Sequence, residues 1–139
     1  ILSDFMFRLP ARRLAAAHAA GRHVGDGQGP SAGTWLYEFR WRSPNGLGAV
    51  HCIDVPFAFG NTGAPAVGVV AGDDPPASLA DDVHGALVRF VTEGDAGWNR
   101  FEPGRPTGMV FDVPSRLDPG LGRAPAGWPD ESVMEAPIG

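Results

Sequence analysis

The stretch TWLYEFRWR, residues 34–42, alternates aromatic with other side chains, and this period of two decides the fold class. Such alternation is typical of a β-strand, because successive side chains point to opposite faces of a sheet. The aromatic side chains predicted to share one face are Trp35, Tyr37, Phe39 and Trp41. Burying a large apolar side chain is worth roughly 1.5–3 kcal/mol, so this face needs a layer packed against it.

Helices are predicted on either side of this strand. Residues 79–93 have apolar side chains at helical spacing. Ser78 and Asp81 are arranged as a capping box at the start of this helix, and Gly94 is the residue that ends it. Residues 4–20 form an earlier predicted helix, which is either kinked at Pro10 or divided there into two helices.

The remaining segments are shorter. Asp54 is predicted to cap a short helix with Pro56 in its first turn, and residues 108–112 to form a short strand. The glycine- and proline-rich residues 21–33 and 60–76 are predicted to be connections. This order is that of an α/β fold. Because it contains only one long strand, it predicts the edge of a larger structure.

Composition limits the kind of protein. The chain has 139 residues, enough for one core, and 43% of them are hydrophobic, which excludes a disordered chain. No apolar run is long enough to span a membrane. The net charge is −5 and all basic residues are arginines without a contiguous stripe, so we expect no nucleic-acid partner. A single cysteine, Cys52, excludes an internal disulfide, and no compartment is predicted.

Residues 29–33, GPSAG, match the G-x-S-x-G pattern of the serine-hydrolase nucleophile elbow. An elbow needs a strand before the serine and a helix after it. Here a glycine-rich segment precedes Ser31 and the aromatic strand follows it. We therefore predict a polar loop.

His51 is the strongest candidate for chemistry. It follows the aromatic strand and precedes a capped turn, a position from which an imidazole can act as general base at the edge of a sheet. A loop histidine with only local hydrogen bonds is the alternative. His18, His23 and His84 have no metal-site spacing, and Cys52 is read as a small buried filler.

Residues 47–60, LGAVHCIDVPFAFG, resemble the histidine segment of type-B carboxylesterases, the group that includes para-nitrobenzyl esterases and cholinesterases. In that pattern Gly-Ala-x-His is followed by an acid and then by Pro-Phe-x-Phe-Gly. Further resemblance to this family is found in residues 3–10, 37–39, 90–101, 109–112 and 118–119.

The resemblance implies that residues 1–139 are the C-terminal part of an α/β-hydrolase fold, ordered as helix, aromatic strand, histidine loop, helix and short strand, and not a complete domain. It implies that His51 is the histidine of a catalytic triad. Leu47, Val50 and Ile53 would face the substrate, and Asp54 would support the loop. No cofactor and no metal are implied.

The family's nucleophile, oxyanion glycines and triad acid lie upstream of this region. The resemblance therefore implies a small-molecule ester as substrate, the N-terminal remainder of the same esterase as partner, and no activity for this chain alone. The alternative is a non-catalytic, α/β-hydrolase-like interaction module. If the aromatic face is normally covered by the missing part, the chain alone is expected to self-associate.

Overall fold

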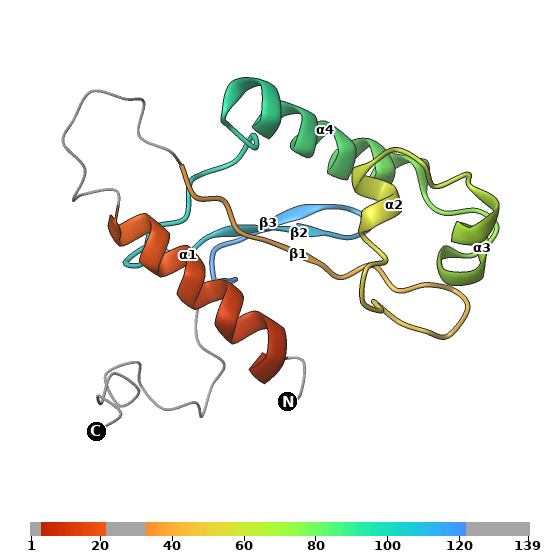
Figure 1. Ribbon diagram of the computed structural model, residues 1–139, viewed down its shortest axis with the longest axis horizontal. Coiled ribbons are helices and arrows are strands. Elements are labelled where there is room, and N and C mark those ends of the chain that lie inside the picture. Colours follow the sequence, from red (N-terminus) through yellow and green to blue (C-terminus); the bar gives the residue numbers. More distant parts are fainter. Residues whose placement is uncertain (1–3, 22–32, 122–139) are drawn as a thin grey trace.

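A small mixed sheet lies between helices in the computed structural model, which describes residues 4–21 and 33–121 (Figure 1). Its strands are β1 (Tyr37–Phe39), β2 (Gly108–Phe111) and β3 (Arg116–Asp118), in that spatial order. β1 and β2 run parallel with Tyr37 opposite Met109, and β2 and β3 run antiparallel. Helices α1 and α4 lie on opposite sides of this sheet.

The aromatic strand lies where the sequence predicts it, but its regular ladder is shorter than residues 34–42. Backbone bonds extend beyond β1 at both ends: the Phe101 amide donates to the Thr34 carbonyl at 2.7 Å, and the Arg40 amide to the Phe111 carbonyl at 2.8 Å. The partner strand β2 has only four residues, which limits the length of the ladder.

The N-terminal helix is confirmed. It consists of a π-helical segment, η1 (Asp4–Arg8), followed directly by α1 (Leu9–Gly21). Pro10 is the second residue of α1, so the change from π-helical to α-helical turns falls next to the proline, which has no amide hydrogen to donate. Ala15 and Ala19 of α1 pack with the buried Phe101 in a small second core, against which Leu36 of the strand region also lies.

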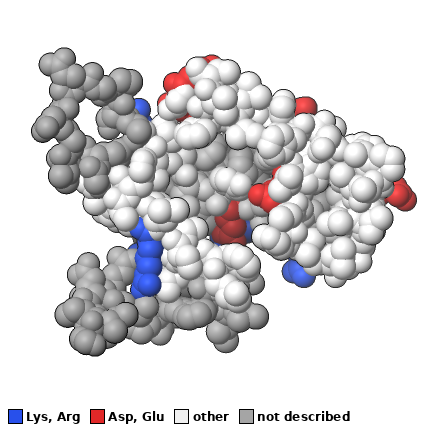
Figure 2. Space-filling model, viewed as in Figure 1, with Lys and Arg blue, Asp and Glu red and all other residues white. Residues whose placement is uncertain are grey.

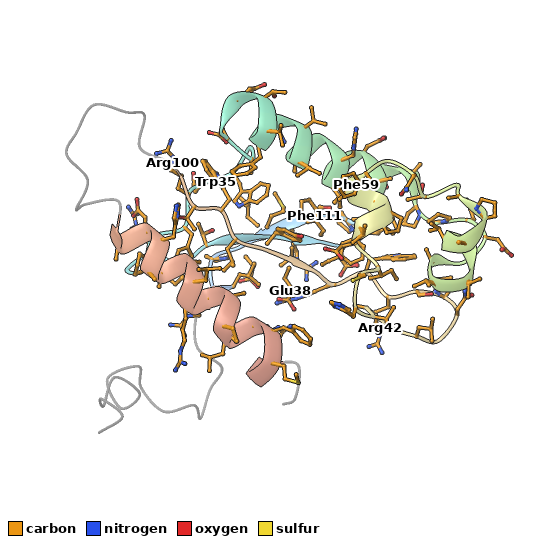
Figure 3. All side chains as sticks on the ribbon, in the orientation of Figure 1. Trp35, Glu38, Arg42, Phe59, Arg100 and Phe111 are labelled. Atoms are coloured by element: carbon orange, nitrogen blue, oxygen red, sulfur yellow. The ribbon has the colours of Figure 1, made fainter. Side chains whose placement is uncertain are left out.

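The main core lies on the other face of the sheet. Helix α4 (Ala77–Glu93) buries Leu79, Val83 and Ala86 there, together with Phe57 of α2 (Val55–Ala58) and Phe111 of β2. Figure 3 shows Trp35 and Phe111 on the α4 side of the sheet and Glu38 on the opposite side.

The aromatic face of the strand is partly covered within the chain itself, and Tyr37 stays 50% exposed. Trp35 packs edge-on against Phe90 of α4 at 5.6 Å between ring centroids, and Phe39 and Trp41 pack against Phe57. Phe57 of α2 and Phe90 of α4 thus supply part of the layer packed against these rings, and a further layer from the rest of the protein stays a prediction. Self-association of the chain also stays a prediction.

Helix α4 confirms the predicted helix 79–93 and the left-handed Gly94 that ends it (φ 68°). The capping box is wrong: the helix begins two residues earlier, Pro76 is its N-cap residue, and no side chain caps it. Asp54 likewise precedes α2 as predicted without a side-chain capping bond.

Two elements were not predicted. Helix α3 (Pro65–Ala71) occupies part of the predicted connection 60–76, and β3 extends the sheet. Ser31, His23 and Trp128, with most of the predicted loop 21–33, lie outside the described residues. Within the described ranges, no helix combines the length and apolarity of a membrane span.

Candidate active site

His51 lies in a loop that returns to the carboxyl end of β1. After β1 the chain makes a turn closed by a bond from the Ser43 amide to the Gly48 carbonyl at 3.1 Å. Asn45 in this turn donates from Nδ2 to the carbonyls of Gly68 and Val69 at 3.1 Å each, so the turn is fixed to α3. The chain then runs back as residues 49–54, which carry His51.

The loop around His51 is held by two tight turns. The Ile53 amide donates to the Val50 carbonyl at 3.1 Å, and the Val55 amide to the Cys52 carbonyl at 3.2 Å. Cys52 has a φ of 65°, a left-handed conformation that is uncommon for a residue with a side chain. These turns place His51 at the exposed side of the loop, directly before α2.

A depression of about 700 Å³ opens beside His51. Its walls are the end of η1, strand β1 with Arg40 and Arg42 after it, the loop 49–54, and Asp112 immediately after β2. Figure 2 shows acidic atoms in a recess near the middle of the viewed face of the molecule. In α/β proteins, ligands bind at the carboxyl ends of parallel strands, and this depression has that position.

The imidazole of His51 is exposed and stacks on Phe7 of η1, with ring centroids 5.8 Å apart and planes 21° apart. Across residues 4–21 and 33–121 it has no hydrogen-bond partner. Its nitrogens are therefore open to groups outside this part of the chain, as a general base requires.

The described residues supply no serine to His51. No serine or threonine is among the described residues that line the depression. Ser43 is buried and its hydroxyl donates to the Val70 carbonyl, so it serves the turn. Cys52 lines the depression and is exposed, which corrects its interpretation as a buried filler.

Tyr37 and Asp54 connect the strand to the histidine loop. The Tyr37 hydroxyl donates to Oδ2 of Asp54 at 3.1 Å. Burial first, and then the charge and hydrogen bond of Asp54, raise the pKa of Tyr37 to about 12. Tyr37 is therefore a neutral donor at ordinary pH. That Asp54 supports the histidine loop stays a prediction, and its bond to Tyr37 is the contact through which it would do so.

Charged side chains on the opposite face of β1 form a network with Glu38 at its centre. Glu38, whose side chain is only 17% exposed, pairs with Arg8 of η1 and accepts from Arg40 at 2.8 Å. Arg40 also lies 3.7 Å from Asp118 of β3. The bond to Glu38 is the main cause that raises the pKa of the Arg40 guanidinium. The network joins η1 to the sheet.

Of the three residues predicted to face a substrate, two line the depression and one does not. Val50 and Ile53 line the depression, although Ile53 is also 3% exposed and part of the main core. Leu47 is 53% exposed on the preceding turn and is not among the lining residues. Their contacts with a substrate stay predictions.

The other described histidines have local partners. Nδ1 of His18 lies 2.6 Å from the Thr34 hydroxyl, and Nδ1 of His84 lies 2.9 Å from the Ala58 carbonyl. No group of three His, Cys, Asp or Glu side chains within the described residues could hold a metal ion.

Sequence patterns offered no functional reason to select Phe7 or Glu38. Phe7 is far from His51 in the chain, and only the docking of η1 on the sheet brings the two rings together. The resemblance in residues 3–10 was the one signal that this segment belongs near the histidine loop.

No protein-family model matches the chain. Phenmedipham hydrolase of Pseudarthrobacter oxydans is 39% identical to it over 87 residues, which amount to 56% of this chain and 17% of that protein. The chain therefore spans about a sixth of the length of this relative.

Solved structures similar to the chain are those of carboxylesterase EST55 from Geobacillus stearothermophilus. The structure at pH 6.8 has a TM-score of 0.66 and 24% identity, covering 84% of this chain and 24% of that one. The structure at pH 6.2 has a TM-score of 0.51 and 27% identity, covering 60% and 19%. The chain is thus carboxylesterase-like, and its helices and small mixed sheet correspond to part of an α/β-hydrolase fold.

Proposed function

We propose that this chain is the histidine-bearing part of a serine carboxylesterase of the type-B group, the one that includes para-nitrobenzyl esterases, and that His51 is its catalytic base. The observation that carries the proposal is the place of His51: an exposed imidazole beside a depression at the carboxyl ends of β1 and β2, with no hydrogen-bond partner in the described part of the chain. The similarity to carboxylesterases supports the same reading.

In this function His51 takes the proton from a serine hydroxyl as its oxygen attacks the carbonyl carbon of an ester. It then gives that proton to the leaving alcohol, and an acyl-enzyme remains. A water molecule, activated by the same imidazole, releases the acid and restores the serine. The substrate class is a small, uncharged carboxylic ester.

The serine and the triad acid are proposed to come from the N-terminal remainder of the same esterase. The edge of β1 supports this partner: in the described sheet β1 has a neighbour on one side only, so its other side offers unpaired backbone groups to a further strand. Without that partner, the same edge is the surface through which the chain alone would self-associate.

The test is His51→Ala in the complete gene product that carries this chain, assayed with a chromogenic ester. We expect kcat to fall by roughly 10⁴-fold or more, as when a triad histidine is lost elsewhere. His84→Ala is the matched control, because His84 is exposed and bonds only to a backbone carbonyl within the described residues.

Undiminished turnover in His51→Ala would refute the role of His51. The 139-residue chain alone is expected to show no turnover. A complete gene product that hydrolyses none of a panel of esters would favour the alternative, a non-catalytic interaction module.

A further inference from the structure

We infer that Phe7 is a positioning residue for His51: its phenyl ring fixes the plane of the imidazole beside the depression. This inference rests on the proposed function of His51 and adds to it a second residue from a distant element. It is carried by the ring contact, by the way η1 is anchored, and by the exposure of Phe7.

The two rings form an offset stack. Their centroids are 5.8 Å apart and their planes differ by 21°, an arrangement that aromatic pairs prefer over a direct face-to-face sandwich. Across the described residues this is the one ring contact of His51, and no hydrogen bond restrains the imidazole there. The stack is therefore the local restraint on its orientation.

Phe7 is held in place by its neighbour in the chain. Arg8, the last residue of η1, pairs with Glu38 of β1, which in turn accepts a hydrogen bond from Arg40. The Glu38 side chain is 17% exposed and that of Arg8 is 53% exposed, so this ion pair is a half-exposed contact between η1 and β1. The π-helical form of η1 is also notable, since such turns are rare and recur at functional sites.

Core packing does not account for Phe7. Its side chain is 56% exposed, and it belongs to neither cluster of buried residues. It lines the same depression as His51. Within the described residues, the ring that Phe7 stacks on is that of the candidate base.

The chemical consequence concerns the imidazolium that forms when His51 takes the serine proton. A phenyl ring restrains the imidazole plane, so that the accepting nitrogen stays aimed at the depression. The π face of the phenyl ring also stabilises a neighbouring cation. Both effects act on the chemical step and leave substrate binding largely unchanged.

The first experiment uses the complete gene product. Phe7→Leu keeps an apolar side chain and removes the π face, and we expect kcat to fall about five- to tenfold with KM within about twofold. Phe7→Tyr retains the ring and should restore kcat to near the wild-type value. Val69→Ala is the control: Val69 of α3 is 74% exposed, does not line the depression, and should leave kcat unchanged.

The second experiment needs no activity. Histidine labelled with ¹³C at Cε1 gives one resonance per ring in the same protein, and His51→Gln identifies the resonance of His51. We expect this resonance to move in Phe7→Leu, to move little in Phe7→Tyr, and to stay in place in Val69→Ala.

The outcomes distinguish the ring stacking, the positioning role of Phe7 and the proposed function of His51. An unmoved His51 resonance in Phe7→Leu overturns the stacking, even if His51→Ala abolishes turnover. A moved resonance with unchanged kcat overturns the positioning role. A moved resonance in a protein that hydrolyses no ester overturns the proposed function, and with it the catalytic meaning of the contact.

Discussion

Replacing Phe57 with alanine is expected to be the most damaging single change near the histidine loop. Phe57 lies in α2, directly after that loop, and its side chain is fully buried (0% exposed). Its ring packs on Phe39 and Trp41 of the strand region, with centroids 5.2 and 5.3 Å away. It therefore joins the loop, the strand and the main core.

The magnitude follows from burial. Returning a phenylalanine side chain to water loses about 1.5–3 kcal/mol of transfer free energy. The cavity left among tightly packed neighbours raises the total loss for Phe→Ala to about 3–5 kcal/mol. Small domains are stable by only about 5–15 kcal/mol, so this loss removes a large part of the free energy of unfolding.

The assay is equilibrium urea unfolding of the chain, followed by tryptophan fluorescence, to which Trp41 contributes directly. With a slope of about 2 kcal/mol per molar urea, Phe57→Ala should lower the midpoint by about 1.5–2.5 M. Phe57→Leu, expected to cost about 1–2 kcal/mol, keeps the test readable if the alanine variant does not fold. Phe59→Ala, two residues along, should change stability by less than about 0.5 kcal/mol because Phe59 is exposed.

Equal effects of Phe57→Ala and Phe59→Ala would refute this reasoning. That result would mean that α2 does not pack its Phe57 face against the strand. A loss below about 1 kcal/mol in Phe57→Ala would mean that the core around it collapses to fill the space.

A Gly→Ala change should alter stability in opposite directions at two positions. At Gly108 the added Cβ would lie 2.7 Å from the Leu36 carbonyl, and stability should fall by about 1–3 kcal/mol. At Gly85 in α4 the added Cβ meets nothing within 4 Å, and stability should rise by about 0.5–1 kcal/mol. Thermal unfolding of both variants checks this, and equal signs would contradict it. Tyr37 is the chain's single tyrosine, so tyrosinate absorbance reports its pKa, which Asp54→Asn should lower from about 12 toward 10 without reaching it, because burial is the larger cause. In the wild type the unfolded chain loses this proton first, so stability should fall as the pH rises from 10 to 12, and a flat profile would count against a raised pKa of Tyr37.

Helix α4 could be predicted because its apolar residues repeat at helical spacing and one face meets the core. The first residue of α4 could not be predicted. Ser78 and Asp81 match a capping box, but Pro76 is the N-cap residue and the helix begins at Ala77. Local capping patterns predict an end only where no neighbouring residue begins the helix earlier.

Helix α3 could not be predicted from its own residues, which include glycine and three β-branched valines. Its last carbonyls accept hydrogen bonds from Ser43 and Asn45, in a turn that is distant in sequence. Carbonyls at the end of a helix need such partners, and here tertiary contacts supply them. The residues 60–76 alone carry no signal of these distant contacts.

In the candidate site, too, some residues could be predicted from the sequence and others could not. His51 could be selected because its neighbours carry a specific pattern, and Val50 because it adjoins that histidine. Phe7 could not be connected to His51, since the contact depends on how η1 docks on β1 through Arg8 and Glu38. Sequence patterns identify the residue that does chemistry more readily than the residues that orient it.

The parallel pairing of β1 with β2 has a consequence for the order of events on the ribosome. Tyr37 leaves the exit tunnel well before its partner Met109, an interval of several seconds at roughly 5–20 residues synthesised per second. During that interval β1 has no β2 to pair with, and Phe111 is not yet present to cover Tyr37. The nascent chain therefore leaves the β2-facing edge of β1 without its partner, open to chaperones, until the last quarter of the chain has been translated.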